Sequence, residues 1–175
     1  LMELYILNAE AHHYLEQHRV LSPEPANDFA FWARGALGDH VLGEALTMLD
    51  VKTGLVRETV DVGAEPYTCV VSPDGKLVVV SVWGGAKVLL FDAATLEKRG
   101  EVAVGEHPNA MVWSKDAARL FVACANTNAV WVVEMAAMTA KEQISVALVP
   151  NAPNGSTPNG LGLSPDGARL LVANA

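Results

Sequence analysis

The residue types best suited to metal binding or catalysis gather near the amino-terminal end of the chain. Neutral imidazoles and carboxylates together bind Zn²⁺ and other divalent ions. The segment 10–44 contains the four histidines His12, His13, His18 and His40, together with carboxylates that include Glu10, Glu16, Asp39 and Glu44. Their spacing fits no known metal motif, and neighbours such as His12 and His13 point in different directions in any regular structure. We therefore expect a solvated loop here and predict no metal site.

Motifs for other catalytic chemistries are absent from the sequence. It contains no Gly-x-Ser-x-Gly nucleophile elbow, no His-Glu-x-x-His zinc motif, no Walker loop and no glycine fingerprint for dinucleotides. After residue 44 there is one histidine, His107, whereas a two-metal phosphoesterase needs clustered Asp and His ligands. We therefore predict no catalytic residues and no cofactor, and expect this chain by itself to be non-catalytic.

The overall charge narrows the class of partner. The formal net charge is −8, and the 12 Lys and Arg residues are scattered along the sequence. Nucleic-acid binding needs clustered basic residues, so it is excluded.

No apolar run approaches the ~20 residues of a membrane helix, and no signal peptide is visible at Leu1–Asn8. We expect Cys69 and Cys124 to be small buried apolar side chains.

An internal repeat organises the rest of the chain. The sequence Ser-Pro-Asp-Gly begins at Ser72 and Ser164, and a degraded copy, Ser-Lys-Asp-Ala, begins at Ser114. These serines are separated by 42 and 50 residues. The same separations hold for Pro66, Pro108 and Pro158. Two independent anchors therefore give one register, and the additional residues of the last interval fall in a long loop at 148–157.

Each repeat unit predicts four short strands. β-branched and aromatic runs bounded by turn signals predict strands at 67–71, 77–82, 87–91 and 99–104. The second unit repeats them at 110–113, 119–123, 129–133 and 142–146, and the last supplies 161–163 and 170–173. Ser72-Pro-Asp-Gly has the residues of a type I turn, and Asp92 can bond backbone amides two residues further on. Four strands in about 42 residues is the spacing of one β-propeller blade.

Earlier residues fit the same register. Ala45–Asp50 aligns with 87–92, and Leu4–Asn8 resembles 170–174. The two alignments together make 10–44 an insertion. Within this part of the chain, Ala9–Arg19 favours a short helix.

We predict that 1–175 is all-β, a partial β-propeller of about three four-stranded antiparallel blades. Complete blades are expected at 67–104 and 110–146, and the start of another at 160–175. A closed propeller needs at least four blades, so we expect a piece of a longer protein.

The expected topology places the loops on two faces. The Ser-Pro-Asp-Gly turns and the turns that begin at Asp92 and its equivalents share one face, here called the turn face. The Trp83-Gly-Gly loop, the Glu106-His107-Pro loop, the loop 148–157 and the insertion share the other, the loop-rich face. Binding residues concentrate in irregular loops on a rigid scaffold. We predict a ligand site on the loop-rich face, formed by Glu65, Trp83, His107, Asn109, Asn126, Asn128 and Thr157.

Structural roles stay open as alternatives for the same side chains. Trp83 could stack on a ligand or pack between blades. Asn126 and Asn128 could bind a ligand or occupy left-handed turn positions. His107 could contribute to the site or be an exposed, loop-bonded histidine.

Several tetrapeptides resemble the repeat signature of the YVTN β-propeller family: Tyr5-Ile-Leu-Asn, Phe121-Val-Ala-Cys and Leu171-Val-Ala-Asn. The wider frame, including Ser81-Val-Trp-Gly-Gly and Val104-Gly-Glu-His-Pro-Asn, is similar to that family. Gly155-Ser-Thr-Pro-Asn-Gly-Leu resembles a segment of large bacterial proteins that couple such a propeller to a carboxy-terminal phosphoesterase of the alkaline-phosphatase type. The resemblance covers 65–175 well, 45–64 fairly and 1–44 poorly.

This resemblance implies a ligand- or protein-binding scaffold within a larger bacterial protein, located in the periplasm or outside the cell. Its partner would be a small molecule, a protein, the missing blades or the phosphoesterase domain. The broader group includes lactonase-like hydrolases of the 6-phosphogluconolactonase type and propeller domains of cofactor-dependent oxidoreductases, and both stay open as alternatives. None of their catalytic motifs is present, so no catalytic residue carries over. Propellers host many activities, and the motifs therefore specify the fold rather than the function.

Overall fold

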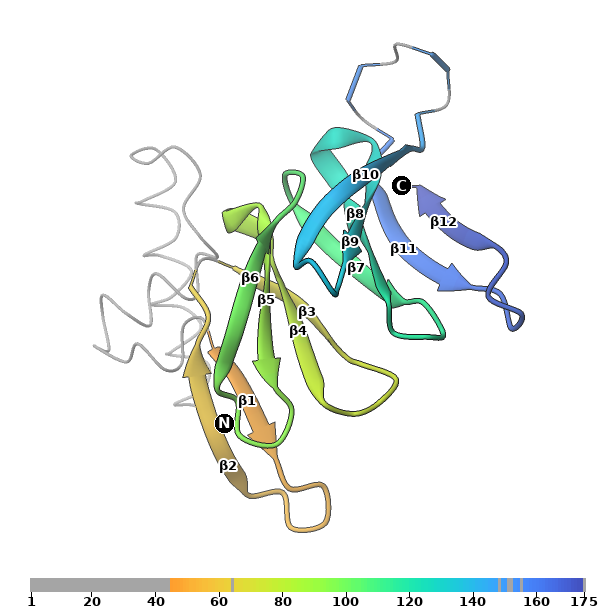
Figure 1. Ribbon diagram of the computed structural model, residues 1–175. Coiled ribbons are helices and arrows are strands. Elements are labelled where there is room, and N and C mark those ends of the chain that lie inside the picture. The colour runs from red at the N-terminus through yellow and green to blue at the C-terminus, as the bar shows by residue number, and fades with distance from the viewer. Residues whose placement is uncertain (1–44, 64, 148, 151–152, 155, 175) are drawn as a thin grey trace, which may run out of the picture.

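The chain folds into a row of antiparallel β-sheets (Figure 1). The computed structural model describes residues 45–63, 65–147, 149–150, 153–154 and 156–174. In this part of the chain the four sheets contain two, four, four and two strands, and short 3₁₀ helices follow the second strand of both four-stranded sheets. The predicted strand Leu4–Asn8, the insertion 10–44 and its short helix lie outside the described residues.

The strands have the following bounds. The first hairpin consists of β1 (Ala45–Leu49) and β2 (Val56–Asp61). The first four-stranded sheet consists of β3 (Pro66–Val71), β4 (Leu77–Val82), β5 (Lys87–Asp92) and β6 (Lys98–Ala103). The second consists of β7 (Pro108–Trp113), β8 (Arg119–Cys124), β9 (Ala129–Glu134) and β10 (Thr139–Ser145). The last hairpin consists of β11 (Pro158–Leu163) and β12 (Leu170–Asn174).

Both four-stranded sheets are meanders in which each strand pairs with the next one along the chain. This is the arrangement expected of propeller blades. The fold is therefore a partial β-propeller, as the sequence predicts. Two strands begin three residues earlier than predicted: β10 begins at Thr139, with a bulge between Ala140 and Glu142 in its pairing with β9, and β11 begins at Pro158.

The core lies between consecutive sheets. In β4, Val79 belongs to a buried cluster that includes Val122 of the next blade. Val80 and Val82 belong to a second cluster, which includes Val62, the residue that directly follows the preceding hairpin. Successive strand residues point to opposite faces, so both faces of this sheet are buried. That explains why its sequence is a continuous apolar run rather than an alternation of apolar and polar residues.

The Ser-Pro-Asp-Gly turns satisfy their own polar groups. The N–H of Gly75 donates to the carbonyl of Ser72 at 2.8 Å. The Ser72 hydroxyl donates to Asp74 Oδ1 at 2.6 Å and accepts from the N–H of Leu77 at 2.9 Å. Equivalent serine–aspartate bonds recur in the other copies, at Ser114 and Ser164. The repeated motif is therefore explained by the architecture.

The second type of turn on this face has an aspartate at its start, as predicted. Asp92 Oδ1 accepts hydrogen bonds from the N–H groups of Ala94 and Thr95, and Arg99 donates to Asp92 Oδ2 at 2.9 Å. The hydrogen bond from Arg99 and those from the backbone lower the pKa of Asp92 to about 2. The equivalent Asp50 has the same kinds of partner, including Arg57. These carboxylates are thus fully occupied in holding turns.

Candidate functional site

The loop-rich face lies at the ends of the strands opposite the turn face (Figure 1). It is formed by the 3₁₀ helices η1 (Trp83–Gly85) and η2 (Ala125–Thr127), by the loop between β6 and β7, and by the loop that enters β11. The described part of the chain therefore has its regular turns at one end and its irregular loops at the other, as the sequence predicts. The insertion 10–44, expected on the same face, lies outside the described residues.

A strained backbone position recurs before each of the three prolines that begin β3, β7 and β11. Glu65, His107 and Thr157 have φ values of 58°, 54° and 25°. Residues other than glycine rarely adopt such φ values, and a residue before proline normally prefers an extended conformation. The carbonyl groups of Glu65 and His107 accept hydrogen bonds from Trp83 and Ala125 respectively, at 2.8 and 3.1 Å. These bonds connect each inner strand to the 3₁₀ helix of its own sheet.

Two of the predicted site residues form an aromatic pair. The rings of Trp83 and His107 stack with their centroids 3.7 Å apart and an interplanar angle of 7°. Trp83 belongs to the first blade, whereas His107 lies in the loop that enters the second. Both side chains remain partly exposed. The pair therefore joins two blades and still presents aromatic surface to solvent.

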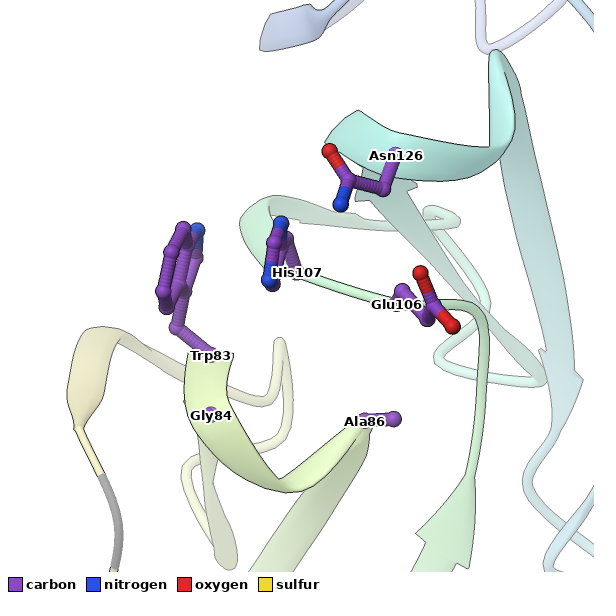
Figure 2. A pocket seen from close by; sticks show the side chains of 6 residues that line it. All are labelled: Trp83, Gly84, Ala86, Glu106, His107 and Asn126. Atoms are coloured by element: carbon purple, nitrogen blue, oxygen red, sulfur yellow. The ribbon is translucent and has the colours of Figure 1, made fainter. Parts of the chain in front are cut away.

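A pocket of about 490 Å³ lies at this junction. Its lining consists of Trp83, Gly84, Ala86, Glu106, His107 and Asn126. Figure 2 shows Asn126 extending from η2 toward His107, and Glu106 on the far side of His107 from Trp83 in this view. Gly84 and Ala86 contribute little side-chain volume, which leaves the space open. Trp83, His107 and Asn126 were predicted from the sequence, and the structure brings them together.

A second hollow, of about 220 Å³, lies beside Trp83 and is lined by Glu65, Pro66 and Tyr67. Glu65 is the residue of the first blade equivalent to His107. Trp83 therefore contributes to two hollows, one with the preceding inner strand and one with the following blade. Thr157, the third equivalent residue, lines neither hollow.

The side chains of Asn128 and Asn109 form hydrogen bonds within the protein and do not line the pocket. Asn128 is 4% exposed and has a left-handed backbone conformation, with φ 47°. Its side chain donates to the carbonyl of Pro153 at 2.9 Å and accepts from the N–H of Ser156 at 2.7 Å. These bonds hold Pro153 and Ser156 against the second blade. The backbone conformation of Asn128 matches the left-handed alternative considered for this residue.

Asn109 is 3% exposed and connects three strands. Its side chain donates to the carbonyl of Pro158 at 2.9 Å and to Asn159 Oδ1 at 3.2 Å. Its own carbonyl accepts from the Ser81 hydroxyl at 3.0 Å. The amide is thus occupied within the protein, and Asn109 lies outside the pocket lining.

Sequence reasoning missed three lining residues: Gly84, Ala86 and Glu106. Glu106 directly precedes His107. Its place beside a predicted site residue could have indicated that it lines the pocket. The contribution of Gly84 and Ala86 is an absence of side-chain bulk, and no motif indicates that. Their place in the site depends on how closely two blades approach each other.

The described residues include few histidine and cysteine side chains, the kinds that bind metal ions or act as thiol nucleophiles. No group of three or more His, Cys, Asp and Glu side chains in this part of the chain is arranged to hold a metal ion. Cys124 is buried beside η2, and burial raises its pKa to about 12, which makes it a poor nucleophile. Cys69 is exposed on β3, so the expectation that both cysteines are buried was wrong for this one. It lies opposite Val80 in the β3–β4 pairing and lines an open hollow with Ala45 and Leu46.

A sequence comparison matches part of the chain to a protein family. A family model described as a family of unknown function, DUF5752, matches residues 7–60, which include β1 and most of β2. No curated protein matches the sequence. Within the described residues no helix is long and apolar enough to cross a membrane.

Two solved structures with similar folds are enzymes by name. Hydrazine synthase from Kuenenia stuttgartiensis has 26% sequence identity and a TM-score of 0.66, over 77% of this chain and 37% of its own. Dihydro-heme d1 dehydrogenase NirN, in complex with DHE, has 20% identity and a TM-score of 0.63, over 75% of this chain and 28% of its own. This chain therefore spans well under half the length of either structure. These likenesses and the sheet topology assign the chain to the β-propeller fold.

Proposed function

We propose that this chain is a non-catalytic β-propeller segment that binds a small molecule in the pocket between its two four-stranded blades. The observation that carries the proposal is the position of the pocket, which lies where the stacked Trp83 and His107 meet the loop-rich face. A volume of about 490 Å³ falls within the range of about 300–1,000 Å³ typical of small-molecule sites. This size favours a small molecule over a protein partner.

The local structure suits a preformed site. The Trp83 ring is held by its stack on His107, and the backbone of each is tied to its own sheet through the carbonyls of Glu65 and His107. Binding would therefore cost little conformational entropy in these two residues. In this proposal the complete blades 67–104 and 110–146 form the scaffold of a larger bacterial protein in the periplasm or outside the cell, as the resemblance to the YVTN family implies.

A fragment screen followed by NMR tests this proposal. We expect fragments to shift the resonances of the Trp83 indole, His107 and Asn126, and His107→Asn to weaken their binding about tenfold, because the aromatic stack is lost. Asparagine tolerates the left-handed conformation, so this variant should fold. Thr157→Asn is the matched control, because Thr157 is equivalent by repeat but lies outside the pocket lining. Fragments that shift none of these resonances, or that bind His107→Asn as well as the wild type, would contradict the proposal.

A lactonase-like hydrolase is the second candidate, supported by one observation. His107 and Glu106 line the same pocket, and imidazole and carboxylate are both zinc ligands. Metal analysis of the purified protein and a lactone hydrolysis assay test it. Positive results in both would overturn the non-catalytic proposal.

The oxidoreductase alternative has the name of one structural neighbour in its favour, a dehydrogenase. At 20% identity that likeness concerns the fold alone, so we rank this alternative third. It predicts a protein with a visible absorption band, and a colourless protein would count against it.

A further inference from the structure

Charged residues are divided unequally between the two faces of the described chain. The loops of the loop-rich face, 62–65, 83–86, 104–107, 125–128 and 146–157, contain no Lys or Arg. Their charged residues are Glu65 and Glu106. On the turn face basic residues are present and paired, for example Arg57 with Asp50 and Arg99 with Asp92. Among the described loop residues of this face, the charged side chains are therefore carboxylates.

Glu106 is the carboxylate that lines the pocket. It is exposed, and each ion pair among the described residues involves other carboxylates. Lys87, which directly follows the pocket residue Ala86, pairs with Glu101 at 3.4 Å. Glu106 takes part in no ion pair among the described residues, so its negative charge is available to a ligand.

The other lining groups complement a positive ligand with an apolar body. The stacked rings of Trp83 and His107 offer aromatic surface, which attracts cations and packs against apolar groups. Asn126 brings a side-chain carbonyl that can accept a hydrogen bond from an ammonium or amidinium group. An anion entering the same pocket would meet Glu106 and find no lysine or arginine in the lining.

We infer that the pocket selects small organic cations, with Glu106 as the counter-ion and the Trp83–His107 pair against the apolar part of the ligand. This inference rests on the proposed function and names its ligand class. The shared chemistry is a nitrogen cation, ammonium or amidinium, attached to an apolar or planar group.

Three probes of nearly one shape and different charge test the inference: benzamidinium, benzamide and benzoate. Binding is measured by NMR titration of the Trp83, His107 and Asn126 resonances. A hydrogen bond to a charged group is stronger than a neutral one by an amount equivalent to about tenfold in affinity. We therefore expect benzamidinium to bind about tenfold more tightly than benzamide, and benzoate to bind most weakly.

Glu106→Gln keeps the shape of the side chain and removes its charge. We expect this variant to bind benzamidinium no better than benzamide. Glu142→Gln makes the same change of net charge at an exposed position on β10 outside the pocket, and it should keep the wild-type preference. Equal loss in both variants would indicate a general effect of net charge and would overturn the inference.

The remaining outcomes separate this inference from the proposed function. If benzamide binds as well as benzamidinium, and both depend on His107, the pocket is a binding site but its ligand class is wrong. If none of the three probes binds while other fragments occupy the pocket, the cation inference fails and the proposed function stands. If no fragment shifts the pocket resonances, both fail.

Discussion

The two faces of the described chain use their polar side chains for different purposes. On the turn face Ser72, Asp74 and Asp92 are bonded to their own turns, and the pattern repeats from blade to blade. On the loop-rich face Glu106 and Asn126 open into a pocket, and the equivalent loops differ in both length and composition. Repetition in this protein therefore marks what the fold requires. The positions where the copies disagree are the ones free to contact a ligand.

The largest expected effect concerns the support of the loop-rich face. Gly105 precedes Glu106, and a Cβ at this position would lie 2.4 Å from Trp131 Nε1 and 2.8 Å from Thr127 Oγ1. Gly105→Ala should therefore lower the free energy of unfolding by about 1–3 kcal/mol, as overpacking does. Chemical denaturation measures the change.

Gly162→Ala is the control, because a Cβ there would meet nothing within 4 Å. Its effect should be about 1 kcal/mol or less. Similar losses in the two variants would mean that the loop before β7 is less tightly packed than the structure indicates.

A pair of small truncations tests the contrast between the faces directly. Ser72 is buried and its hydroxyl holds a turn, so Ser72→Ala should cost about 1–2 kcal/mol of stability. Asn126 is exposed in the pocket, so Asn126→Ala should change stability by less than about 0.5 kcal/mol. Thermal and chemical denaturation of the two variants give the comparison. A larger loss for Asn126→Ala would assign that residue a structural role.

The smallest effect is a pH dependence confined to the turn face. The pKa of Asp92 is lowered from 3.8 to about 2 in the folded protein, chiefly by Arg99. Its contribution to stability is therefore complete above pH 3.8 and is lost as the pH falls toward 2. The difference in melting temperature between the wild type and Asp92→Asn should shrink over this range. A difference that stays constant would show that the ionised carboxylate does not stabilise the turn.

The sequence predicted much of this fold because its information is local and repeated. The repeated serines and the repeated prolines have the same separations, 42 and 50 residues. This common spacing placed the strands and assigned each loop to a face. β-branched runs and turn residues act over a few positions, so they can be read without knowing how the blades pack. The exposure of Cys69 was missed because burial depends on neighbours distant in the sequence.

The candidate site was predicted only in part for the same reason. Trp83, His107 and Asn126 could be recognised as polar or aromatic residues in irregular loops. Asn128 and Asn109 have structural roles because they form hydrogen bonds with residues 25 and 49 positions further along the chain. Tertiary contacts of this kind leave no trace in spacing, so side-chain type alone could not separate ligand contacts from structural ones.

The unequal length of the loops has a consequence for how such a protein can change. The connection between β6 and β7 covers 104–107, whereas the one between β10 and β11 covers 146–157. Yet Asn109 still bonds to Pro158 and Asn159 across the longer connection. Tripling a flexible loop costs only about 1 kcal/mol of closure entropy. New sequence can therefore be accepted at this end without refolding, which makes the loop-rich face the evolvable side of the molecule.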